Sequence, residues 1–141
     1  MPVTTLLAIV IAAAAPSPVP DSVAVSVFLE ALNPDPSADV LCLAINGGDP
    51  DANVLEQLRR SFPTLVASSE CEPNLSGSKH IASGKLAVIV SISNFKVLPK
   101  HKAEAHVSVY RNGKSGHGKK VWLHEAKGTW VVEGSAIDMV I

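Results

Sequence analysis

The sequence predicts an α+β fold in which two N-terminal helices pack on an antiparallel β-meander, and three observations support this. Apolar residues at the 3–4 spacing of a helical face occur only in the first half of the chain. Beyond Gly77 the apolar period becomes two, which is typical of strands. Helices that precede the strands, instead of alternating with them, indicate an α+β domain and not an alternating parallel sheet.

The N-terminus predicts a signal peptide. An uninterrupted apolar run extends from Leu6 to Ala15, and three prolines follow by Pro20. Such a run is too short to cross a bilayer as a helix, but it matches the apolar part of a secretory signal. The first basic residue is Arg59, so the positive charges that usually open a signal are missing. The alternative is a buried first helix or strand of the fold.

Residues 1–20 are therefore assigned to a signal peptide and a proline-rich junction, and residues 21–141 to a single α+β domain. Apolar residues make up 47% of the chain and charged residues 18%, a composition too hydrophobic for a disordered protein. We expect an exported protein, periplasmic or secreted, with no transmembrane span in the mature chain.

The first expected helix has Asp21 or Ser22 as its N-cap and stops at Asn33-Pro34. Alternating apolar residues between Val23 and Leu29 also fit a strand, so both alternatives stay open. The helical prediction depends on a stripe with the spacing of one helical face, formed by Ala24, Val27, Phe28, Ala31 and Leu32.

A short buried strand and a second helix follow. Val40 to Ile45 is an apolar run that ends at a turn, Asn46-Gly47-Gly48. We expect Asp49 to cap the second helix with Pro50 in its first position. The apolar face of this helix consists of Val54, Leu55, Leu58 and Phe62.

The second half predicts the strands of the meander. The segment from Leu86 to Val97 is rich in β-branched residues, with Leu86, Val88, Val90 and Ile92 on one side. The next strand alternates apolar Ala103, Ala105, Val107 and Val109 with polar Glu104, His106, Ser108 and Tyr110, the pattern of a sheet with one wet face. Residues 121–125 and 130–132 flank a turn at Lys127-Gly128.

The last hairpin, Trp122-Leu123-His124-Glu125-Ala126-Lys127-Gly128-Thr129-Trp130-Val131-Val132, together with the element order, resembles the nuclear-transport-factor-2-like or cystatin-like α+β class. The motif is Gly128-x-Trp130-x-Val132. This resemblance implies a curved sheet that forms a cone, which either encloses a pocket or packs shut as a structural module. The chain also resembles small exported bacterial proteins of unassigned function that have a Cys-Leu-x-Ile strand and a second cysteine after the next helix.

Cys42 lies inside the first predicted strand, and Cys71 follows the second helix. In an oxidising compartment such a pair predicts a structural disulfide, which stabilises a fold by about 3–4 kcal/mol for a loop of this length. If the chain is not exported, both cysteines are buried free thiols. Two cysteines without a nearby histidine pair make a poor metal site, so no metal is expected.

Four polar residues form the one candidate catalytic group, namely Glu104, His106, Tyr110 and His124. We expect His106 and His124 on adjacent strands, with Glu104 and Tyr110 on the face of His106. A histidine and a carboxylate on a concave sheet suit general base catalysis or, with a third ligand, zinc binding. On a wet face the same residues are ordinary surface side chains, which is the interpretation that we favour.

A basic, glycine-rich segment between residues 111 and 120 is expected to form a long hairpin loop. It either presents cations and backbone N–H groups to an anionic surface or protein, or is only a soluble turn. Gly113-Lys114-Ser115 is similar to the end of a nucleotide-binding loop, but Ser108 occupies the place of its required glycine, so no cofactor is expected. No nucleic-acid-binding motif is present. The candidate anion-binding residues are Arg111, Lys114, Lys119 and Lys120.

The sequence thus predicts an exported binding or structural module without catalytic activity, whose ligand it does not identify. The alternative is a pocket-type enzyme or small-ligand carrier of the cone-shaped class, in which Glu104, His106, Tyr110 and His124 point inward. Convergence of these four side chains in one closed cavity would favour the alternative.

Overall fold

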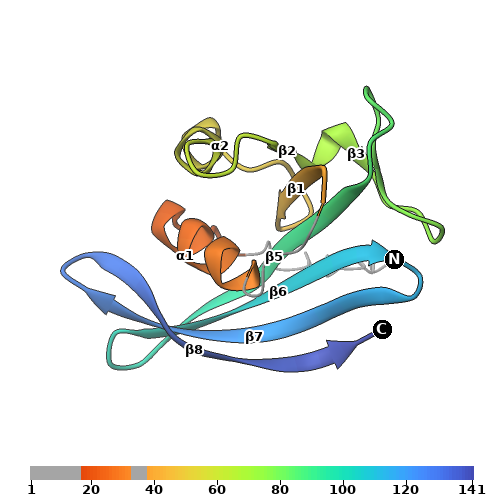
Figure 1. Ribbon diagram of the computed structural model, residues 1–141. Helices are drawn as coiled ribbons and strands as arrows, with labels where there is room; N and C mark the ends of the chain where they lie inside the picture. The colour runs from red at the N-terminus through yellow and green to blue at the C-terminus, as the bar shows by residue number, and fades with distance from the viewer. Residues whose placement is uncertain (1–16, 33–37) are drawn as a thin grey trace, which may run out of the picture.

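The computed structural model describes residues 17–32 and 38–141, which form helices packed on a twisted sheet (Figure 1). The fold class is α+β, as the sequence predicts. In chain order the elements are α1 (Asp21–Ala31), β1 (Val40–Ile45), α2 (Ala52–Arg59), β2 (Leu65–Ala67), the 3-10 helix η1 (Ser68–Glu70), β3 (Cys71–Glu72), β4 (Lys79–His80), β5 (Ala87–Leu98), β6 (Lys102–Asn112), β7 (Ser115–Ala126) and β8 (Thr129–Val140).

The main sheet has six strands in the order β2-β1-β5-β6-β7-β8. Strands β5 to β8 form the expected antiparallel meander. The sheet is not antiparallel throughout, however, because β1 pairs in parallel with both β2 and β5. The apolar run of β1, buried along nearly its whole length, is typical of a parallel strand that is covered on both faces.

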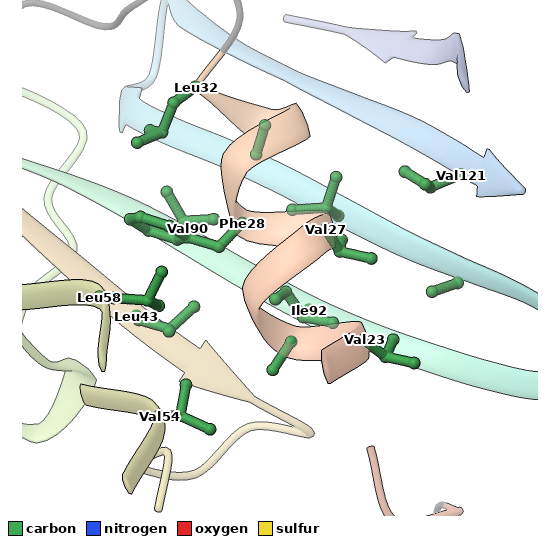
Figure 2. Close-up of a cluster of buried hydrophobic side chains, with 14 of the residues drawn as sticks. Val23, Val27, Phe28, Leu32, Leu43, Val54, Leu58, Val90, Ile92 and Val121 are labelled. Atoms are coloured by element: carbon green, nitrogen blue, oxygen red, sulfur yellow. The ribbon is translucent and has the colours of Figure 1, made fainter. Parts of the chain in front are cut away.

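Both helices cover the same face of this sheet. Helix α1 lies over the meander, and α2 packs beside β2 and α1. Figure 2 shows Val27 and Phe28 of α1 facing Val90 and Ile92 of β5. The stripe predicted for the first helix is buried as expected, and the ring of Phe28 meets the edge of Phe62 at 5.5 Å between centroids.

Neither helix has the cap that the sequence suggested. Pro20 occupies the N-cap of α1, and the Ser22 hydroxyl instead accepts a hydrogen bond from the Trp130 N–H at 3.4 Å. Helix α2 begins later than expected, with Asp51 at its N-cap and no side-chain cap. Asp49 has a different role, because its carboxylate accepts hydrogen bonds from residues of η1.

The Asp49 carboxylate connects the loop after β1 to η1. It accepts hydrogen bonds from the Ser69 N–H at 2.8 Å, the Ser69 hydroxyl at 2.6 Å and the Ser68 hydroxyl at 3.1 Å. The bonds from Ser69 lower the pKa of Asp49. Because η1 leads directly into Cys71, this contact helps to fix the cysteine beside the sheet.

The predicted disulfide between Cys42 and Cys71 is present, with 6.5 Å between the Cα atoms. It belongs to a small second core, on the side of the sheet away from the helices, with Val40 and Ala87. The β3–β4 pair lies next to this core. Leu86, which the sequence places on the same side of the strand as the buried Val88, Val90 and Ile92, is 58% exposed.

The predicted signal segment Leu6 to Ala15 and the helix stop at Asn33-Pro34 lie outside the described residues. Within residues 17–32 and 38–141, neither helix has the length and apolar character needed to span a bilayer.

Candidate binding surface

The face of strands β5 to β8 that points away from the helices is called the open face here. Alternation along β6 places Glu104, His106 and Tyr110 on this face, while the residues between them are buried under α1. Antiparallel pairing with β7 adds His124 to the same face, opposite Lys102. All four residues of the candidate group therefore share one face.

The four residues do not converge on one point. The register of β6 and β7 pairs His106 with Lys120 and not with His124, so the expected histidine neighbours are separated along the strands. Tyr110 lies toward the other end of β6, where its hydroxyl donates to the Asn74 carbonyl at 3.4 Å. The tight turn between β6 and β7 determines this register, because each residue of one strand acquires a fixed partner on the other.

A hollow of about 200 Å³ occupies the middle of the open face. An ion pair and a histidine–carboxylate contact cross it: Lys120 Nζ lies 3.1 Å from Glu104 Oε2, and His106 Nε2 lies 3.1 Å from Asp138 Oδ1. The hollow is lined by Asn94, Glu104, Ala105, His106, Lys120 and Asp138.

Gly118 leaves space for the contact between His106 and Asp138. A Cβ atom at this position would lie 3.0 Å from the His106 ring and 3.1 Å from the Asp138 carboxylate. A side chain at this position would therefore crowd the His106 ring and the Asp138 carboxylate, which would have to shift by a few tenths of an ångström.

A second histidine and acid meet at the other end of the face. His124 Nδ1 lies 3.3 Å from Glu133 Oε1, and the Lys102 ammonium donates to the same oxygen. The hydrogen bond from Lys102, helped by the positive charges of Lys102 and His124, lowers the pKa of Glu133.

Glu133 and Asp138 are the extra residues of two bulges in β8. The pairing with β7 skips Glu133 between Val132 and Gly134, and skips Asp138 between Ile137 and Met139. Val131 and Ala136 lie on the open face opposite His124 and Lys120, so Glu133 and Asp138, each two residues further along β8, point to the same face. Neither acid was predicted, because two register shifts interrupt the alternation of β8 and its residue pattern alone does not show which residues share a face.

Apolar side chains lie among these charges. Trp122 is 37% exposed and Val131 is 42% exposed, and both lie on the open face. The Lys120 ammonium approaches the Trp122 ring at 6.0 Å from its centroid. The face therefore presents aromatic and aliphatic groups beside paired charges.

The four candidate anion-binding residues are not brought together. The expected long loop is a short turn around Gly113 and Lys114, since β7 begins at Ser115. Lys119 is buried on the helix side, where its ammonium donates to the Glu30 carbonyl near the end of α1. Lys120 lies on the open face, and Arg111 lies near the end of β6. Successive residues of a strand point to opposite faces, so Lys119 and Lys120 cannot serve one ligand.

His117, on the helix side of β7, is the histidine whose environment disfavours its charge. Burial lowers its pKa, and the positive charges of Lys119 and Arg111 add to the effect. Lys119 donates to the Glu30 carbonyl of α1, so this cation helps to hold the helix on the sheet.

One polar cluster escaped the sequence analysis. In the hairpin turn after β4, His80 Nδ1 lies 2.7 Å from Ser83 Oγ, and His80 Nε2 lies 3.6 Å from Glu70 Oε1. Serine, histidine and glutamate occur together in nucleophilic sites. Here, however, Ser83 is an exposed residue of the turn that also accepts from the Lys85 N–H, so the contact closes the hairpin.

In the part of the chain that the structure describes, no three His, Cys, Asp or Glu side chains are grouped so as to hold a metal ion. Comparison with family models, curated proteins and solved structures finds no significant match to this chain.

Proposed function

We propose that this protein is an exported binding module without catalytic activity, and that its partner contacts the open face of the sheet. The single observation that supports this most is the asymmetry of the sheet. The helices bury one face, while Trp122 and Val131 stay partly exposed on the other among ion pairs. Interfaces typically combine aromatic anchors with a polar surround.

The arrangement of the ionisable groups favours binding over catalysis. A general base needs a free lone pair aimed at a substrate proton. On the open face, His106 faces Asp138, His124 faces Glu133, and Glu104 faces Lys120. These pairs are spread along the strands and do not converge on one point, so the face resembles a binding surface more than a poised catalytic group.

Two observations support export. Cys42 and Cys71 form a disulfide, and structural disulfides persist in oxidising compartments. The apolar segment Leu6 to Ala15 has the composition of a secretory signal. N-terminal sequencing of protein from the producing cells tests this: we expect a start near the proline-rich junction, in the extracytoplasmic fraction. Cytoplasmic protein that retains Met1 would contradict export.

The open face is tested by immobilising the protein and recovering what it retains from the extracytoplasmic fraction. The double variant Trp122→Ser/Val131→Ser should lose the retained component, because it removes the apolar anchors of the face. Leu29→Ser is the matched control, since Leu29 is 47% exposed on α1. If all three proteins retain the component equally, or if only Leu29→Ser loses it, the open face is not the binding site.

A small-ligand carrier is the second candidate function, favoured by the hollow of about 200 Å³. Because acids and a lysine surround it, a zwitterion such as an amino acid fits its chemistry. A panel of amino acids should raise the Tm of the wild type if this candidate holds. Gly118→Ala should reduce the shift, because its Cβ crowds His106 and Asp138.

A further inference from the structure

A second surface lies at the end of the molecule that carries β3, β4 and the β6–β7 turn. We call it the tip surface and define it by three apolar and three cationic residues: Leu75, Ile81, Leu86, Lys79, Lys85 and Lys114. Figure 1 places the turns on either side of β4 at this end, projecting beyond the sheet. None of these residues belongs to the open face.

The apolar residues of the tip surface are unusually exposed. Leu75 is 79% exposed, Ile81 is 62% exposed and Leu86 is 58% exposed. Leu75 and Ile81 are each part of a turn, where a polar residue would satisfy the backbone equally well. Their exposure therefore has no explanation in the packing of the described fold.

Hydrogen bonds hold the parts of the tip surface together. The Gly113 N–H donates to the Leu75 carbonyl at 2.9 Å, which places Lys114 beside Leu75. The His80 N–H donates to the Lys85 carbonyl at 2.9 Å, and Lys79 is bridged to Leu86. The two turns are thus attached to the sheet, and their apolar residues are presented on ordered backbone.

The charges of the tip surface favour an anionic partner. In the part of the chain that the structure describes, neither Lys85 nor Lys114 forms an ion pair. Three acids lie near: Glu70 faces His80, Glu72 is the register partner of Lys79 on β3, and exposed Asp39 precedes Val40, whose N–H donates to the Leu86 carbonyl. Two lysines therefore remain available beside the three exposed aliphatic side chains.

We propose that the tip surface binds the interface of an anionic lipid bilayer. Side chains that protrude singly from turns fit a soft interface, which accepts apolar groups without a complementary cleft, whereas a protein partner needs a matching pocket for each. Lysines next to inserted aliphatic groups reach anionic headgroups with their ammonium ends. The proposal does not depend on the open face, and its variants leave that face unchanged.

The test is flotation with vesicles that contain phosphatidylglycerol and phosphatidylcholine in equal amounts. We expect the wild type to partition onto these vesicles, less at high salt, and weakly onto phosphatidylcholine alone. Leu75→Ser/Ile81→Ser should lower the partition coefficient by at least about tenfold. Lys85→Gln/Lys114→Gln should lower it roughly 25-fold, from about fivefold per lysine.

Matched controls lie at the opposite end of the strands. Val97 is 62% exposed near the β5–β6 turn, and Lys100 and Lys127 lie in the two turns of that end. Val97→Ser and Lys100→Gln/Lys127→Gln should partition like the wild type. The proposal is overturned if the partition coefficients of these controls fall as much as those of the tip variants. It is also overturned if the folded wild type is retained by heparin but floats with no vesicle.

Discussion

At the scale of single residues, the chemistry of the open face depends on two bulged acids. The register shift at Glu133 moves the alternation of β8 by one residue, which places Asp138 on the same face as Glu133 and His106. With these register shifts, β8 places an acid beside each of the two histidines. A pattern of alternating residues does not reveal where such shifts occur.

The disulfide is expected to contribute a large part of the stability. Cys42→Ser should lower the free energy of unfolding by about 3–4 kcal/mol, because it releases a loop closed over 29 positions in the unfolded chain. The Tm should fall by roughly 10 °C or more. Calorimetry without reductant measures this, and an unchanged Tm would show that the bridge is dispensable.

Asp49 is expected to make stability depend on acid pH. Its folded-state pKa is lowered by the bonds from Ser69, so its contribution is fully present above about pH 4 and is lost as the pH falls through the folded-state pKa. Asp49→Asn should lower the Tm at pH 7 by a few degrees and flatten the acid limb of the curve. Asp51→Asn is the control, since Asp51 makes no side-chain cap. If the Tm of both variants depends on pH in the same way, Asp49 does not have this role.

At the scale of elements, the spacing of apolar residues identified the helices and the strands, because burial of one face of an element determines that spacing. Helix α1, β1, β5 and β6 lie where the sequence predicts, and α2 lies within its predicted segment but begins later than expected. Parallel pairing of β1 was not predictable, since it depends on where the chain returns after α2. The segment from 111 to 120 was mistaken for a loop, because its glycines and lysines resemble turn residues although most of it lies in strands.

Helix α1 is expected to be held by its buried aromatic residue. Phe28 is fully buried between the sheet and Phe62, so Phe28→Ala should destabilise the fold by about 3–5 kcal/mol. Leu29→Ala, one residue further along and half-exposed, should cost no more than about 0.5 kcal/mol. Urea titrations compare the two. Similar losses at both positions would mean that α1 does not pack as described.

At the scale of the whole molecule, one layer of helices on one sheet leaves one face available. The face of Glu104, His106, Tyr110 and His124 was predictable, because alternation places every second residue of a strand on the wet side. Their separation was not predictable, since it follows from the register. Asp138 was missed as a member of the central hollow for the same physical reason.

The central claim, that the partner of this protein contacts the open face, is tested most directly by photo-crosslinking in the producing cells. A photo-reactive phenylalanine analogue replaces Trp122 on the open face or, in a matched strain, Glu56 on the exposed side of α2. We predict a discrete adduct from position 122 that is absent from position 56. Adducts of equal yield from both positions, or an adduct from position 56 alone, would contradict the claim.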